Sequence, residues 1–218
     1  MNRERLAFYL NHYGLFRTVR VYAHRALQRL VDFDIMRVET ASGEATDSPV
    51  VEPYVTRQVS ADEYRSGLQL LGAEHDRSNA FVRRDRCFAN LLDSQLVGYQ
   101  FYAGRSTVAR SGLEFAFPDT LTYAYASFTH PDHRGKRLAR ARANARRCAD
   151  QAAGIQRNVV WYISVDNLPS LAVSRRLNVA HLGYVAYLRI RKRYYCYASP
   201  ACVRAGVSLI STGGQATK

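Results

Sequence analysis

The chain has 218 residues and a mass of 24.7 kDa, a length that favours one large domain. Hydrophobic residues make up 47% and charged residues 22%, a globular balance that excludes disordered, collagen-like and low-complexity chains. No stretch approaches the roughly 18 apolar residues that a spanning helix needs. The N-terminus lacks an apolar run followed by a small-residue cleavage site. We therefore expect a cytoplasmic protein.

The net charge is +13, and 28 of the 31 basic residues are arginines. The charge is concentrated in three stretches: residues 1–30 carry +5, residues 134–157 carry +7 and residues 175–193 carry +6. A surface of this kind attracts phosphates, nucleic acid, an anionic membrane or an acidic carrier protein, and charge alone does not choose among them. Because the sequence holds no nucleic-acid-binding motif, nucleic acid is the disfavoured partner.

The four cysteines are Cys87, Cys148, Cys196 and Cys202. They form no C-x-x-C pair and none has metal-site spacing with a histidine. We expect buried free thiols and no bound metal.

Apolar residues recur at three- and four-residue steps over residues 2–31, which predicts a helix that Gly14 divides or weakens. Three interpretations of this segment stay open. It packs on the domain as an accessory helix, or lies on an anionic membrane face, or docks an acidic acyl-carrier protein or a second copy of the chain.

A strand is predicted over residues 33–38 and a polar loop over residues 41–53. Ser60 and Glu63 have the spacing of a capping box, which predicts a helix toward Gly72. Two hairpins follow, one from residues 87–92 with 95–103, the other from residues 112–117 with 121–129.

A helix is predicted over residues 136–152. Its apolar face holds Leu138, Ala141, Ala145, Cys148 and Ala152, while Arg137, Arg140, Arg146 and Arg147 are expected to face solvent or an anion. Residues 158–165 predict a strand buried on both faces. A short helix over 170–177, strands over 184–190 and 194–197 and a frayed tail complete the chain.

The informative segment is the strand, turn and basic helix around FTHPDHRGKRLA. Backbone N–H groups at a helix N-terminus lack partners and carry partial positive charge, so a loop that wraps into such an end binds phosphate. Arg134, Lys136 and Arg137 add full charges there. We therefore predict a pyrophosphate site at residues 134–139.

This segment resembles the acyl-CoA-binding motif of the GCN5-related N-acetyltransferases, Gln/Arg-x-x-Gly-x-Gly/Ala at a helix start. Arg134 and Ala139 match its ends, Arg137 stands where the central glycine is usual, and Gly135 lies two places earlier. Arg137 either takes a glycine-like conformation under strain or is helical and contacts a phosphate. The resemblance implies that the donor is acetyl-CoA or another acyl-CoA, held by Phe128, Thr129, Arg134, Gly135, Lys136, Arg137, Leu138 and Ala139.

A looser resemblance covers VDNLPSLAVSRRLNVAHLGY, and together the two span residues 54–197. It implies that Asn167 and Ser170 also contact the cofactor. The family frequently places a tyrosine seven residues after this asparagine as general acid for the departing thiolate, and here that position is Ser174.

The general base stays open, because the strand before the loop carries Tyr123, Tyr125 and Ser127 rather than an acid. Glu114 is the nearest carboxylate in the sequence, and His130 and His133 are alternatives. We assign Glu114, Tyr125 and Ser174 as candidate catalytic residues. Tyr123 and Tyr125, with Phe115 and Phe117, either line an acceptor pocket or belong to the core.

We predict a mixed, mostly antiparallel α/β fold of the GCN5-related type, with a helical extension (1–40), an acyltransferase domain (41–203) and a flexible tail (204–218). The expected reaction is acyl transfer from acyl-CoA to a small-molecule amine. Two alternatives are a long-chain acyltransferase that uses a carrier protein or a membrane-associated substrate, and a non-catalytic acyl-CoA-binding module. A homodimer is a further alternative, as is peripheral attachment to the inner membrane face.

Overall fold

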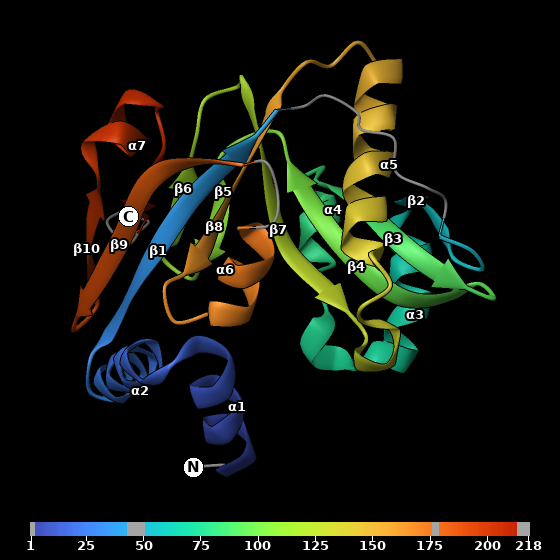
Figure 1. The fold of residues 1–218 in the computed structure, drawn as a ribbon. Helices are drawn as coiled ribbons and strands as arrows, with labels where there is room; N and C mark the ends of the chain where they lie inside the picture. The colour runs from blue at the N-terminus through green and yellow to red at the C-terminus, as the bar shows by residue number, and fades with distance from the viewer. Residues whose placement is uncertain (1–2, 43–50, 176–178, 213–218) are drawn as a thin grey trace. The chain divides into compact units, whose positions relative to one another are not determined.

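The computed structural model describes residues 3–42, 51–175 and 179–212 of the chain (Figure 1). These residues form two compact units that interleave along the sequence. Unit 1 combines residues 1–41, 106–118 and 161–218, and unit 2 combines residues 42–105 and 119–160. The division predicted from the sequence is linear instead, because periodicity does not show which distant segments return to the same core.

Unit 1 begins with the helices α1 (Arg3–Tyr13) and α2 (Leu15–Leu30), which are separated at Gly14 with φ of 79°. This confirms the helical prediction and its break. Tyr9 and Val21 pack with Leu168 and Leu171 of α6 (Leu168–Ser174), and Arg25 Nε bonds Asp166 Oδ2 at 2.6 Å. The two helices therefore pack on unit 1 as the accessory-helix interpretation expects.

The strands of unit 1 form two sheets. The first has the order β10-β9-β1-β8, and the second has the order β11-β6-β5. Strand β9 pairs antiparallel with both β1 and β10. The strands and the last short helix are β1 (Asp32–Ala41), β5 (Thr107–Arg110), β6 (Leu113–Ala116), β8 (Asn158–Ser164), β9 (Ala180–Ile190), β10 (Arg193–Ala198), α7 (Pro200–Arg204) and β11 (Ser208–Ser211).

Unit 2 holds a sheet of order β8-β7-β4-β3-β2, in which the first residues of β8 pair parallel with β7 and the other pairs are antiparallel. This mixed, mostly antiparallel pattern agrees with the predicted fold class. Its elements are β2 (Val55–Val59), α3 (Ala61–Leu71), η1 (Ala73–His75), α4 (Asn79–Val82), β3 (Arg86–Leu92), β4 (Gln95–Ala103), β7 (Leu121–Thr129), η2 (Pro131–His133) and α5 (Leu138–Ala152).

Local sequence signals account for the boundaries in unit 2. Glu63 N donates to Ser60 Oγ at 3.2 Å, and Glu63 Oε2 accepts from Ser60 N at 2.8 Å, so the capping box starts α3 as predicted. The β3–β4 hairpin is also confirmed. The core of this unit lies between α3 and the sheet, where Tyr64, Cys87 and Phe101 are fully buried.

The predicted hairpin of residues 112–117 with 121–129 is wrong. Strand β6 pairs with β5 and β11, whereas β7 pairs with β4 and β8. Pro118 and Asp119 are a turn signal in the sequence, but they lie where the chain passes from one unit to the other. Turn residues indicate that the chain changes direction. They do not show that the strands before and after the turn pair with each other.

Three further expectations need correction. Residues 208–211 form β11 on the edge of β6, although they belong to the predicted frayed tail. Cys148 and Cys196 are exposed, while Cys87 and Cys202 are buried as expected, and all four thiols are free. Only Val159 and Val160 of β8 are buried. The rest of the tail, residues 213–218, and part of the loop predicted over 41–53 lie outside the described residues, as do 176 and 177 of the helix predicted over 170–177.

The predicted faces of α5 are wrong in part. Leu138 is buried and Arg137 and Arg140 are exposed as expected, but the rest of the buried face differs. The buried residues are Leu138, Arg142, Arg146 and Asp150, four residues apart, whereas Cys148 is exposed. Arg146 Nη1 donates to Asp150 Oδ2, and Arg86 Nη2 lies 2.5 Å from Asp150 Oδ1. Because Arg146 pairs with Asp150, one turn later on the same helix, its charge is compensated where it faces the sheet. Hydrophobic periodicity does not predict a buried ion pair of this kind.

Candidate functional site

The turn between β7 and α5 takes the form that the sequence predicts. Strand β7 ends at Thr129, residues 131–133 form one 3-10 turn, and α5 begins at Leu138, two residues later than predicted. Gly135 has φ of 78°, and Arg137 is left-handed with φ of 57° and ψ of 19°. Of the two interpretations of Arg137, the glycine-like conformation is confirmed.

This turn presents a run of backbone donors. In the part of the chain that the structure describes, no acceptor meets the N–H groups of the five successive residues 135–139. Successive N–H groups around left-handed residues, next to a helix N-terminus, form a concave site for anionic oxygens. The geometry is therefore suited to phosphate or diphosphate.

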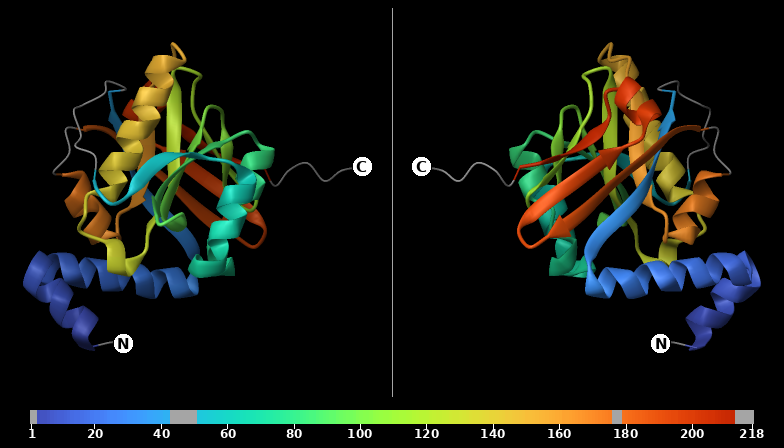
Figure 2. Two further views of the ribbon diagram at one scale, coloured as in Figure 1. Left: turned by 90° about the vertical axis from the view of Figure 1, so that its right-hand side faces the viewer. Right: turned by 90° about the vertical axis from the view of Figure 1, so that its left-hand side faces the viewer.

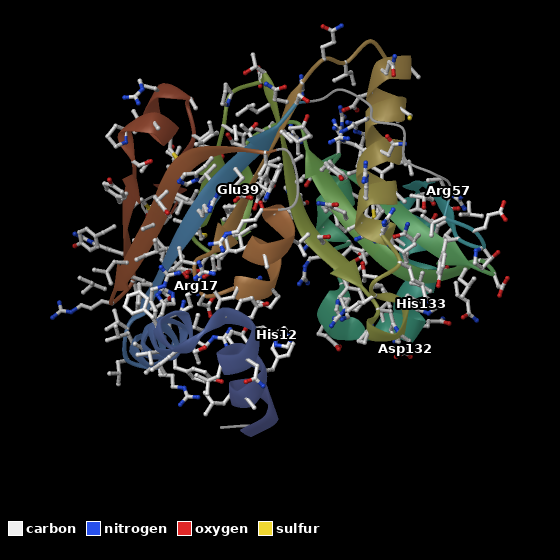
Figure 3. The ribbon with its side chains drawn as sticks, viewed as in Figure 1. His12, Arg17, Glu39, Arg57, Asp132 and His133 are labelled. Atoms are coloured by element: carbon white, nitrogen blue, oxygen red, sulfur yellow. The ribbon has the colours of Figure 1, made fainter. Side chains whose placement is uncertain are left out.

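Basic side chains reinforce this donor turn. Arg134 Nε donates to Thr129 O at 3.1 Å, and Arg137 is exposed. Lys136 Nζ donates to the Tyr54 hydroxyl at 2.8 Å, and that hydroxyl lies 2.9 Å from His133 Nδ1. Figure 3 labels Asp132 and His133 on this turn.

An open hollow borders the turn. It is lined by Gly135, Lys136 and Arg137 from one side and by Val51, Glu52 and Tyr54 from the segment before β2. Two of these six residues are cationic and one, Glu52, is acidic. The net charge of the lining therefore favours an anion, although the carboxylate of Glu52 repels it.

A β-bulge interrupts β7 just before the turn. Tyr99 pairs with Phe128, and Phe101 pairs with Tyr125, so Ala126 and Ser127 together face one residue of β4. Ala126 has φ of 47°. A bulge leaves an extra residue out of the ladder, and such residues are over-represented beside functional sites.

A buried arginine lies beneath the bulge. Arg142 is fully buried, and its guanidinium donates to Asn90 Oδ1, to Ser127 Oγ at 3.3 Å and to Thr129 Oγ1 at 3.1 Å. Among the described residues it has no carboxylate partner. Burial lowers the pKa of Arg142 to about 10. It stays charged at neutral pH and ties the bulge and the strand end to α5.

Tyr125 is held by a buried acid. Its hydroxyl donates to Asp85 Oδ2 at 2.6 Å and accepts from Arg83 Nη2 at 3.2 Å. Burial raises the pKa of Tyr125, and the hydrogen bond to Asp85 raises it further. Asp85 could not be predicted from the sequence, because a lone aspartate before a strand carries no pattern.

Ser174 also donates to a buried acid. Its hydroxyl bonds Glu39 Oε2, which accepts from Trp161 Nε1 at 3.1 Å as well. Arg37 Nε lies 2.8 Å from Glu39 Oε1. Glu39, labelled in Figure 3, is fully buried on β1 of unit 1. Glu39 could not be predicted from the sequence, because β1 precedes every segment that carries the resemblance.

The remaining predicted site residues lie as follows. Asn167 is the N-cap of α6, where its side chain accepts from Ser170 N at 3.3 Å. Glu114 is half-buried on β6, between Val108 and Ile210 of the neighbouring strands. Phe128 lies against His75, with ring centroids 4.0 Å apart and ring planes tilted by 46°. Glu114, Asn167, Ser170 and Ser174 belong to unit 1, whereas Tyr125 and residues 128–139 belong to unit 2.

Burial distinguishes between the pocket and core interpretations for three of the four aromatic residues. Phe115, Phe117 and Tyr123 are buried, with at most 6% of their surface exposed, which favours the core interpretation for these three. Tyr125 keeps a half-buried position on β7.

The described residues contain no group of three or more His, Cys, Asp or Glu side chains placed to hold a metal ion. His130 Nδ1 lies 3.8 Å from Asp132 Oδ2, a long contact within one turn. None of the described helices is both long and apolar enough to cross a membrane.

No family model and no curated protein matches the sequence. Among solved structures, a Drosophila protein is similar at 14% identity and a TM-score of 0.49, over 79% of this chain and 57% of that one. A GNAT-family protein from Novosphingobium aromaticivorans shares 16% identity at a TM-score of 0.49, over 72% and 63%. A GCN5-related N-acetyltransferase from Kribbella flavida shares 16% at a TM-score of 0.47, over 75% and 61%. The chain thus spans less than two thirds of each of these proteins.

Proposed function

We propose that this chain is an acyltransferase of the GCN5-related type that transfers an acetyl or longer acyl group from acyl-CoA to an amine. The observation that supports it most is the donor turn: five successive N–H groups without acceptors among the described residues, two left-handed residues, and three cationic side chains. This turn follows a bulged strand, in the order that the motif resemblance implies.

The donor turn would bind the diphosphate of the coenzyme. The N–H groups from Gly135 to Ala139 would donate to its oxygens, and Arg134 and Arg137 would add charge-assisted contacts. Lys136 is already bonded to Tyr54, so it would act through its charge from a fixed position. Phe128 and Thr129, at the strand end, and Asn167 and Ser170 are the further proposed cofactor contacts.

The proposed reaction is direct. The amine nitrogen attacks the thioester carbonyl carbon, the C–N bond forms, the C–S bond breaks, and the thiolate leaves. A backbone N–H at the bulge would polarise the carbonyl oxygen. Glu114 is the proposed base for the ammonium proton. Tyr125 and Ser174 are the proposed donors to the thiolate, and each would turn its own hydroxyl hydrogen from a buried carboxylate to the sulfur.

A matched pair of glycines tests donor binding. Gly135 and Gly154 have φ of 78° and 67°, and a Cβ at either would meet nothing within 4 Å. Gly135→Glu and Gly154→Glu therefore impose similar backbone strain and the same charge, but only the first lies in the donor turn. We expect coenzyme A at 100 times its Kd to stabilise the wild type and Gly154→Glu by roughly 2.7 kcal/mol in a thermal-shift titration. Gly135→Glu should show no shift.

Equal shifts in both variants, or no shift in the wild type with coenzyme A, acetyl-CoA and a long-chain acyl-CoA, would contradict donor binding at this turn. The preferred chain length would separate an acetyltransferase from a long-chain acyltransferase.

A non-catalytic acyl-CoA-binding module is the second candidate. It is favoured by one observation: the hydroxyl hydrogens of Tyr125 and Ser174 are both already bonded to buried carboxylates. Coenzyme A binding without turnover of any amine in a panel would support this module. Release of free thiol from acetyl-CoA that depends on an added amine would support the enzyme.

A further inference from the structure

Helix α2 packs one face on the rest of unit 1, and its opposite face is exposed. The packed face carries the buried Thr18 and Val21 and the half-buried Arg25. Figure 2 shows α2 side-on in both views, with α1 bent away from one end. At about 1.5 Å per residue, its 16 residues give a rod of roughly 24 Å.

The outward face of α2 is a continuous apolar row. Phe16, Val19, Leu27 and Leu30 are 82%, 56%, 53% and 82% exposed, and Ala23 lies between them. These positions recur at steps of three or four residues, so they share one side of the helix. Four large apolar side chains aligned in water form a patch of the kind that marks an interaction surface.

Arginines flank this row. At 100° per residue, Arg20 falls about 20° beyond Leu27 at one edge, and Arg17 and Arg29 fall about 80° beyond the two edges. No acidic residue occurs in α2. Among the described residues no acid pairs with these three arginines, whereas Arg25, on the packed face, bonds Asp166. The outward arginines are therefore available to an external anion.

We propose that α2 lies in the surface of an anionic lipid bilayer, with its apolar row among the acyl chains and its arginines at the headgroups. An amphipathic helix that lies flat takes this arrangement, with the apolar face buried about 5–10 Å. The four large apolar side chains stand out from one helix, and the arginines beside them complement anionic headgroups. The surface of a bilayer accommodates both the apolar row and the flanking charges. This proposal does not depend on the proposed acyltransferase activity.

Vesicle co-sedimentation tests the proposal with the full chain. We expect binding to phosphatidylcholine vesicles with about one third phosphatidylserine, weaker binding at high salt, and little binding to pure phosphatidylcholine. Arg17→Gln with Arg20→Gln should weaken binding roughly 25-fold, since each basic residue near the surface contributes about fivefold. Phe16→Ser with Leu30→Ser should weaken it at least roughly tenfold.

The control is Val203→Ser with Arg204→Gln, which changes a similarly exposed apolar and basic pair on α7 of the same unit. It should bind like the wild type. A second readout comes from Phe16→Trp, whose fluorescence should be quenched by acyl-brominated lipid in anionic vesicles.

Three results would overturn the proposal. These are no binding to anionic vesicles at low salt, equal loss in the α7 control, and unchanged binding in both α2 variants. A dimer in sedimentation velocity that Phe16→Ser with Leu30→Ser dissociates, without vesicle binding, would assign the face to a second copy of the chain.

Discussion

Arg137 shows how one residue combines strain with a candidate function. It is the N-cap of α5 in the left-handed region, where a side chain costs about 1 kcal/mol relative to glycine. It lies within the run of N–H groups of residues 135–139 that have no acceptor among the described residues, and its exposed guanidinium adds charge at the same place. A glycine would keep the backbone conformation and lose the charge.

We therefore expect Arg137→Gly to stabilise the fold by about 1 kcal/mol and to weaken coenzyme A binding roughly three- to tenfold. Thermal denaturation and calorimetric titration would measure the two effects. Arg191→Gly is the control, because Arg191 is exposed with φ of 56° in the turn between β9 and β10. It should be stabilised similarly and bind coenzyme A like the wild type. Equal binding by both variants would remove Arg137 from the site.

Helix α3 depends on its capping box. Ser60→Ala removes the acceptor for Glu63 N, and we expect a loss of about 1 kcal/mol in urea denaturation. An unchanged midpoint would mean that the cap contributes nothing to the stability of unit 2.

The same cap predicts an acid dependence. The Arg57 guanidinium, together with Ser60 N, lowers the pKa of Glu63 to about 2 from 4.5. Because the folded pKa is the lower one, this carboxylate stabilises the fold above pH 4.5 and the contribution fades as pH falls toward 2. The side chain is 44% exposed, so solvent screening keeps the effect modest. Denaturation between pH 5 and about 3 should show a shallower loss of stability in Glu63→Gln than in the wild type.

The buried face of α5 includes Arg142 and Arg146, whereas the spacing of its small residues predicts that those small residues are buried. Arg142→Ala would leave a large cavity and unpaired groups on Asn90 and Thr129, and we expect a loss of about 3 kcal/mol. Arg140→Ala, on the exposed face two residues earlier, should change stability by less than about 0.5 kcal/mol. Chemical denaturation compares the two, and equal effects would contradict the assigned faces.

At the scale of the whole molecule, β11 from the last part of the chain pairs with β6 from the middle of the chain. Leu209 of β11 is 5% exposed and pairs with Phe115 of β6, while the adjacent Ile210 is 48% exposed. We expect Leu209→Ala to cost about 2–4 kcal/mol and Ile210→Ala less than about 0.5 kcal/mol by thermal denaturation. Similar small losses would mean that this strand is marginal and would restore the interpretation of the segment as a frayed tail.

Part of the candidate site could be predicted from the sequence and part could not. The donor turn could be predicted because its signals are local: an apolar strand, Pro131 and Gly135, and a basic helix start. Glu39 and Asp85 could not be predicted, because each acts on a hydroxyl, Ser174 or Tyr125, that lies far away in the sequence. The hydrogen bonds form only when distant strands are brought together.

By itself the sequence determined the split N-terminal helix, the α3 cap, the β3–β4 hairpin and the turn from β7 into α5, since each depends on interactions within a few residues. Only the tertiary structure decided that β6 pairs with β11 rather than β7, and that Arg142 and Arg146 point inward. Strand partners and buried charges depend on which remote groups are available to hydrogen bond, and local periodicity carries no record of them.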